Sequence, residues 1–101
     1  MTLDLKPKGD ERAVEQAYKG TRMQVMIMSV PPNGIIPMEM HDGEQFIRVE
    51  AGTGTVYFDG SDDRLPLIAG DAVVITEQTH HEIIAGEHGL RFYTVYAPPA
   101  H

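Results

Sequence analysis

The chain has 101 residues, a formal net charge of −7 and no cysteine. Its 15 acidic residues outnumber 8 scattered lysines and arginines, which argues against a nucleic-acid partner because such a partner needs clustered basic side chains. Without cysteine, disulfides and thiolate metal sites are excluded. A hydrophobic fraction of 42% in a chain of this length predicts one domain with one core over residues 1–101.

The sequence also lacks the features of membrane and exported proteins. No run of about 18 consecutive apolar residues could span a bilayer, and residues 1–10 contain no apolar stretch long enough for a signal sequence. We therefore expect a soluble, cytoplasmic protein without a membrane partner.

The N-terminal third is predicted to form a β-hairpin. Two extended segments, residues 13–18 and 22–30, flank a turn at Lys19-Gly20-Thr21. The second segment has one alternating apolar face, formed by Met23, Val25 and Ile27. A helical turn over residues 11–18 is the alternative, but its apolar stripe would be poor.

Turn signals divide the rest of the chain into further short strands. They lie at residues 31–34, 42–43, 52–54, 59–63, 69–71 and 86–89. Pro37 permits an edge position or the first position of a strand before the Glu39 segment. The later strands are expected at residues 55–58, 65–68, 72–76, 80–85 and 90–96. About nine short, evenly spaced strands without an amphipathic helix predict an all-β sandwich or barrel.

Residues 38–52 contain the first group of possible metal ligands. Glu39 and His41 are two residues apart, so in a strand both point to one face, about 6.6 Å apart at ~3.3 Å per residue. Met38 and Met40 should face away from them. The two side chains could therefore bind one ion.

The strand that follows the turn at residues 42–43 offers a third candidate. If Gln45 points inward, Ile47 and Val49 follow it, and the charged residues of the strand face the other way. This parity favours Gln45 over Glu44 as a ligand.

Residues 70–85 contain the second group. His80 and His81 are adjacent on a strand, so they point to opposite faces and at most one can share an interior site with His41. Parity alone leaves the choice open, because Ile83 accompanies His81 and Ile84 accompanies His80.

Two spacings resemble the two motifs of the cupin superfamily. The first motif reads Gly, five residues, His-x-His, three or four residues, Glu, six residues, Gly. In this chain Glu39 and His41 occupy the two histidine positions of that motif. Gln45 occupies its glutamate position, and Gly52 is its final glycine. The second motif is Gly, five residues, Pro-x-Gly, two residues, His, three residues, Asn. Counting from Gly70 places His81 at the histidine position. The tail, residues 90–101, is similar to the ending of small mannose-6-phosphate isomerase-like cupins.

Several motif positions carry other residues. Besides Glu39 and Gln45, Asn33 stands at the first glycine of the first motif. In the second motif, the Pro, Gly and Asn positions are occupied by Thr76, Gln78 and Ala85.

The resemblance implies an all-β fold, a small double-stranded β-helix (jelly-roll, cupin) barrel. It further implies one divalent transition metal (Fe, Mn, Ni, Co or Zn) inside the mouth, bound by Glu39, His41, Gln45 and His81. A divalent ion with one carboxylate ligand keeps a positive charge, so it can polarise a carbonyl or hydroxyl and lower the pKa of bound water. Taken singly, Glu39 could be a solvated rim carboxylate and His41 a hydrogen-bonded core histidine; their joint spacing with His81 favours ligation.

The other polar candidates receive smaller roles. We expect His80 and His88 at the surface or at a pocket rim, because neither has a partner at ligand spacing. Tyr93 and Tyr96 have opposite parity on the last strand, so at most one should line the pocket.

Three functions remain open for a barrel with a small-molecule substrate or ligand. The isomerase-like resemblance implies a metal-dependent enzyme acting on a sugar, sugar acid or similar small polar molecule without net redox change. The set Glu39, His41 and His81 also permits a non-haem Fe(II) dioxygenase. The altered motifs fit a non-catalytic sugar-binding or small-molecule-binding barrel. A homodimer is implied as well, and an exposed apolar edge strand at residues 23–27 would give a physical reason for pairing.

Overall fold

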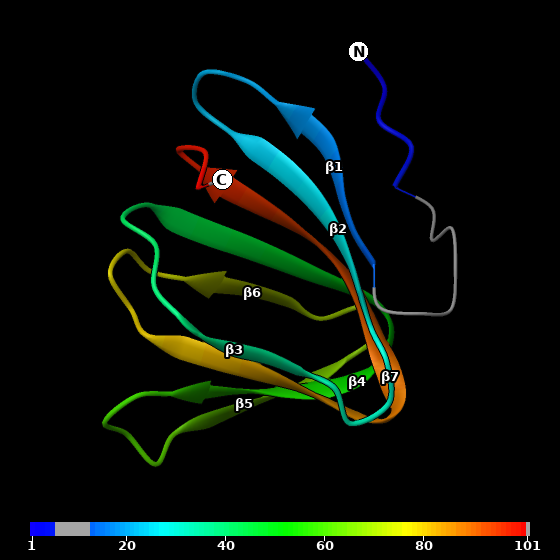
Figure 1. Cartoon of the computed structure of the whole chain (residues 1–101), viewed down its shortest axis with the longest axis vertical. Helices are drawn as coiled ribbons and strands as arrows, with labels where there is room; N and C mark the ends of the chain where they lie inside the picture. Colours follow the sequence, from blue (N-terminus) through cyan, green and yellow to red (C-terminus); the bar gives the residue numbers. More distant parts are fainter. Residues whose placement is uncertain (6–12, 101) are drawn as a thin grey trace.

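The described part of the chain, residues 1–5 and 13–100 of this computed structural model, consists of strands and loops without a helix (Figure 1). It is an all-β double-stranded β-helix. The seven strands are β1 (Ala13–Lys19), β2 (Gln24–Val30), β3 (Ile35–Glu39), β4 (Glu44–Phe58), β5 (Arg64–Ile68), β6 (Ala72–Ile75) and β7 (His81–Ala97). No helix able to cross a bilayer occurs among these described residues.

Two long antiparallel strands, β4 and β7, form the centre of the fold. They pair over nearly their whole length, from Glu44 opposite Ala97 to Phe58 opposite His81. The first half of β4 pairs with β6, and its second half pairs with β5. Likewise, the first half of β7 pairs with β3 and its second half with β2. Each long strand therefore belongs to both layers of the barrel.

The predicted turns at residues 52–54 and 86–89 are wrong. Both segments lie inside strands, and β4 shifts its register against β7 on either side of Gly52. Gly52 and Gly89 each have a φ of +80°, and a Cβ at Gly52 would collide with the Gly89 carbonyl oxygen. Glycine allows the strands to bend there while their pairing continues, so seven strands replace the nine expected.

The two layers meet where β4 and β7 bend, and they spread apart toward the left of Figure 1. One layer contains β1, β2, β6 and half of each long strand; the other contains β3, β5 and the remaining halves. We call the open end of the barrel the mouth. β3 and the second half of β7 end there, and β4 and the first half of β7 begin there.

The core lies between the layers and follows the predicted parity of β4. Gln45, Ile47 and Val49 are buried, whereas Glu44 and Glu50 are exposed. The apolar core cluster comprises Val30, Ile36, Ile47, Val49, Val56, Leu67, Ile75, Ile83, Ala85, Leu90 and Phe92. Inward side chains of both layers thus fill the barrel below its mouth.

The predicted N-terminal hairpin is present, but its second strand is not at an edge. β1 pairs with β2, and β2 pairs on its other side with β7. Val25 is 3% exposed and Ile27 8%, so both faces of β2 are covered, and the expected exposed edge strand at residues 23–27 is wrong. Residues 13–18 are extended and not helical; residues 11 and 12 of the helical alternative lie outside the described part.

Candidate metal centre

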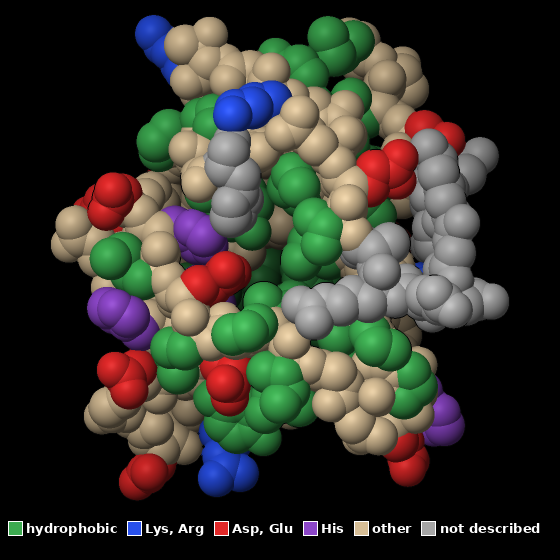
Figure 2. All heavy atoms as spheres, in the orientation of Figure 1, with side chains coloured by type: hydrophobic (Ala, Val, Ile, Leu, Met, Phe, Trp, Pro, Cys, Tyr) green, Lys and Arg blue, Asp and Glu red, His purple; other side chains and the backbone are tan. Residues whose placement is uncertain are grey.

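Backbone pairing at the mouth brings three candidate ligands together. Glu39 is the last residue of β3 and stands opposite His81, the first residue of β7, while His41 follows in the next turn. Oε1 of Glu39 lies 3.3 Å from Nε2 of His41 and 3.7 Å from Nε2 of His81. One donor atom from each residue lies within 4.8 Å of the others. Figure 2 shows histidine and acidic side chains close together on the mouth side of this face.

The imidazole of His81 is held in one tautomer. Its Nδ1 lies 2.9 Å from the Thr79 carbonyl oxygen, which can only accept, so Nδ1 carries the hydrogen. In the neutral ring the lone pair of Nε2 then faces Glu39, and Nε2 makes no hydrogen bond to any described residue although His81 is 1% exposed. Two electron-rich atoms facing each other repel unless a cation or a proton lies between them. The donor set therefore fits a metal ion.

His41 is packed against an aromatic side chain. Its ring centroid lies 4.7 Å from that of Tyr96 at an interplanar angle of 62°, and 5.9 Å from that of His81. The side chain of His41 is 11% exposed. This packing fixes the direction in which His41 presents Nε2.

A turn over residues 77–79 contacts both histidines through its backbone. The sequence analysis did not predict this role of the turn. The amide of Gln78 donates to the His41 carbonyl at 2.7 Å, and the neighbouring Thr79 carbonyl accepts from His81. Both histidines are thus positioned by backbone atoms of adjacent residues. Because backbone atoms make these contacts, they do not require particular side chains at these positions. Only the motif spacing could have indicated that the turn lies beside the histidines.

Gln45 lies on the inner face of the facing layer, opposite Tyr96 in the β4–β7 register. It is 2% exposed, its Nε2 donates to Thr94 Oγ1 at 3.0 Å, and its Oε1 makes no hydrogen bond to a described residue. This buried oxygen is suited to be a neutral fourth ligand, but the 4.8 Å cluster consists of Glu39, His41 and His81.

Tyr96 is the tyrosine of the last strand that lines the site, as parity allowed. It is 3% exposed, whereas Tyr93 is half-buried on the outer face. Burial, followed by the negative charge of Glu39, raises the pKa of Tyr96 far above its usual value of 10. The phenol therefore stays neutral at physiological pH.

A hollow of about 340 Å³ opens beside His41. It lies between residues 40–43 and the tail segment 98–100, and the tail is held by a 3.1 Å hydrogen bond from the Ala100 amide to Oε1 of Gln24. Of the three candidate ligands, His41 lines this hollow, so a small molecule bound there would contact the edge of the cluster.

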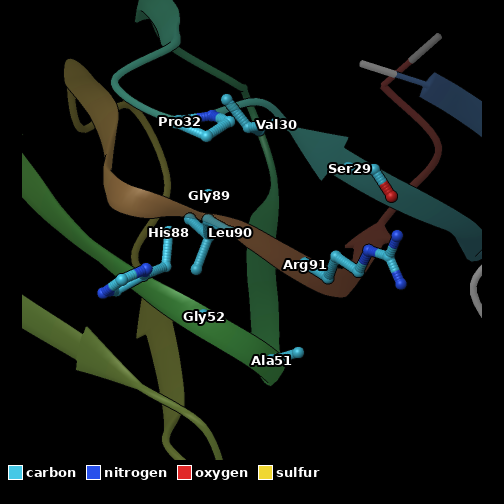
Figure 3. A pocket seen from close by; sticks show the side chains of 9 residues that line it. All are labelled: Ser29, Val30, Pro32, Ala51, Gly52, His88, Gly89, Leu90 and Arg91. Carbon is cyan, nitrogen blue, oxygen red and sulfur yellow. The ribbon is translucent and has the colours of Figure 1, made fainter. Parts of the chain in front are cut away.

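A larger hollow of about 480 Å³ lies at the bend of the long strands, away from this cluster (Figure 3). Its two basic side chains, His88 and Arg91, point away from each other. His88 is a 79% exposed rim residue, and His80 is also exposed, as expected. Without convergent polar groups, this hollow is the weaker candidate for the functional site.

The model of the cupin domain family matches residues 26–96. The chain belongs to the cupins. The uncharacterised protein YrkC of Bacillus subtilis is 34% identical over 90 residues, which are 83% of this chain and 48% of that protein, so the chain spans about half of this relative. The crystal structure of BH2720 from Bacillus halodurans is 31% identical, with a TM-score of 0.84 over 90% of this chain and 74% of that one. An RmlC-like cupin from Methanocaldococcus jannaschii shares the fold at 16% identity, with a TM-score of 0.82 over 97% and 90% of the two chains.

The backbone is left-handed at two of the positions where the chain departs from the cupin motifs. Asn33 and Gln78 stand at motif glycine positions, and they are the two non-glycine residues with positive φ in the described part, at 60° and 59°. This cupin keeps the left-handed conformation at both positions without glycine. Asparagine tolerates it readily, whereas glutamine does so at a cost.

Proposed function

We propose that this cupin binds one divalent transition metal through Glu39, His41 and His81, with Gln45 as a neutral fourth ligand, and acts as an enzyme on a small polar substrate without net redox change. The observation that carries the proposal is the buried Nε2 of His81, which faces Glu39 without a hydrogen bond. Its tautomer is set by Thr79, as is typical of a metal-binding histidine.

Iron, manganese, nickel, cobalt and zinc all accept these donors. When bound, such an ion would supply Lewis acidity, because a single carboxylate leaves it positively charged. The protein's own groups orient the site. Thr79 and Gln78 hold the histidines, Thr94 holds the amide of Gln45, and the neutral phenol of Tyr96 packs on His41.

The hollow beside His41 suits a small substrate. Its volume of about 340 Å³ lies at the lower end of the range for small-molecule sites. The tail resembles that of mannose-6-phosphate isomerase-like cupins, which supports a sugar, sugar acid or similar polyol as substrate. The reaction that needs only Lewis acidity and a proton carrier is isomerisation or a related proton transfer beside a carbonyl.

Proton NMR in D2O tests this function directly. Metal-loaded protein is incubated with a panel of aldoses, ketoses and uronic acids, and we expect deuterium to appear at the carbon next to the carbonyl of one of them. Glu39→Gln should abolish the exchange, whereas His80→Ala, which changes an exposed neighbour of the site, should retain it. Metal-loaded protein that leaves every compound of the panel undeuterated would contradict the proposed reaction.

Two other functions each have an observation in their favour. Two histidines and one carboxylate within 4.8 Å form the ligand set of non-haem Fe(II) oxygenases, and oxygen uptake by the Fe(II)-loaded protein on addition of substrate would identify that activity. Gln45 in place of the motif glutamate fits a binding protein that has lost catalysis. Sugar binding by metal-free, folded protein would favour that reading.

A further inference from the structure

The hollow beside His41 contains one acidic side chain, and no lysine or arginine stands among the described residues that line it. The acidic side chain is that of Asp42, which follows His41 in the turn between β3 and β4. Asp42 is exposed, and no described cation forms an ion pair with its carboxylate. A ligand in the hollow therefore meets a negative charge that no neighbouring side chain offsets.

The tail wall of the hollow has no free backbone donor. This wall is formed by Pro98, Pro99 and Ala100. Proline has no N–H, and the amide of Ala100 already donates to Oε1 of Gln24 at 3.1 Å. Gln24 is 1% exposed and its Nε2 donates to Oε1 of Gln16 at 2.8 Å, so the amide of Gln24 is fixed in the orientation that accepts from the tail. The backbone of this wall can therefore accept hydrogen bonds from a ligand but donate none.

Such a lining is unsuited to anionic ligands. Proteins bind phosphate and carboxylate groups with guanidinium or ammonium groups and with N–H donors. A phosphate ester carries a charge of about −1.5 to −2 at neutral pH, and a uronic acid is likewise an anion. Lys19 pairs with Gln24, the residue that holds the tail, but Lys19 does not line the hollow. An anion beside Asp42 is thus repelled without a compensating contact.

The charge of the candidate metal centre distinguishes between neutral and cationic ligands. A divalent ion bound by Glu39 and otherwise by neutral ligands keeps one positive charge. Asp42 places one negative charge next to His41, so the site as a whole is close to neutral and favours an uncharged ligand. The hydroxyl groups of a sugar can donate to the carboxylate of Asp42 and to the backbone of the tail.

We propose that this hollow takes neutral sugars and polyols and rejects sugar phosphates and uronic acids, with Asp42 as the specificity-determining residue. The inference rests on the proposed function, because it concerns the same site, and it narrows the substrate class of that function to uncharged polyhydroxyl compounds. Selection arises as much from repulsion of the wrong ligand as from hydrogen bonds to the right one.

Ligand-observed NMR titration of the metal-loaded full chain tests this selection by binding, independently of turnover. The probes are matched pairs: mannose with mannose-6-phosphate, fructose with fructose-6-phosphate, and glucose with glucuronic acid. We expect the neutral member of at least one pair to bind at least about tenfold more tightly than its anionic counterpart, since the two differ in charge at a site without a cation.

Charge-changing variants locate the selection at Asp42. Asp42→Lys should shift the preference toward the anionic member by at least about tenfold, and Asp42→Asn should shift it in the same direction by a smaller factor. Asparagine suits the same turn, so it keeps the test valid if Asp42→Lys folds poorly. Glu50→Lys makes the same change in net charge at an exposed position of β4 and should leave the preference unchanged. Metal content is measured in each variant, so that a lost ion is not mistaken for altered selection.

Binding and deuterium exchange together separate this inference from the proposed function. Neutral sugars that bind with the expected preference but do not exchange would support the inference and contradict the reaction. A uronic acid or sugar phosphate that exchanges at least as fast as its neutral counterpart would support the reaction and overturn the inference. Anions that bind as tightly as neutral sugars, a protein that binds none of the probes, or an unchanged preference in both Asp42 variants would also overturn it.

Discussion

Gln78→Gly should make the protein more stable while preserving both contacts of the turn over residues 77–79. Gln78 has a φ of 59°, a conformation that costs a residue with a Cβ about 1 to 2 kcal/mol. Its side chain is exposed, so little packing is lost on removal. Glycine relieves the strain but loses about 0.5 to 1 kcal/mol through its more flexible unfolded state. The net gain is about 0.5 to 1 kcal/mol, or roughly 2 to 8 °C in Tm for a chain of this size.

Thermal unfolding followed by circular dichroism measures this gain, and two variants serve as controls. Glu77→Gly, next to Gln78 but without a positive φ, should lose about 0.5 to 1 kcal/mol, because it increases flexibility without relieving strain. Asn33→Gly should change Tm little, since asparagine tolerates its φ of 60°. A Tm of Gln78→Gly at or below that of the wild type would refute the strain argument.

Three further outcomes follow from the structure. Gly52→Ala should cost about 3 kcal/mol or more in urea unfolding, because its Cβ meets backbone, whereas Gly60→Ala, also at positive φ but in open space, should cost only about 1 to 2 kcal/mol. Thr94→Val should cost about 1 to 3 kcal/mol, because it leaves the buried amide of Gln45 without its acceptor; a cost near zero would contradict that role. In metal-free protein, the raised pKa of Tyr96 means that the folded state holds a proton that the unfolded state releases above pH 10. Stability should therefore fall as pH rises beyond that value, by up to ~1.4 kcal/mol per unit, and Tyr96→Phe should remove this slope while Tyr93→Phe keeps it.

The inner face of the site could be predicted from local sequence, since strand parity depends only on neighbouring residues. Parity selected Gln45 over Glu44, and the structure buries the first and exposes the second. Parity could not choose between His80 and His81, because apolar residues accompany both. The longer cupin spacing chose His81, which the structure places beside Glu39.

Long-range pairing determined what the sequence could not predict. Glycines such as Gly52 and Gly89 occur both in turns between strands and in bends within a strand. Only the continuous β4–β7 pairing shows that these two glycines lie in bends. The burial of Val25 and Ile27 likewise depends on what covers the outer side of β2, which an alternating pattern does not reveal. Metal ligation by Glu39, His41, Gln45 and His81 stays a prediction.

Metal analysis of untagged protein tests the central claim most directly. After reconstitution with Fe, Mn, Ni, Co or Zn and removal of excess ion, mass spectrometry of the elements should find about one ion per chain for at least one metal. His41→Ala and His81→Ala should lose it, and His80→Ala should keep it, because that residue is exposed and lies outside the cluster. A wild type that holds none of the five metals, or variants that bind them equally well, would contradict a metal centre at the mouth of this barrel.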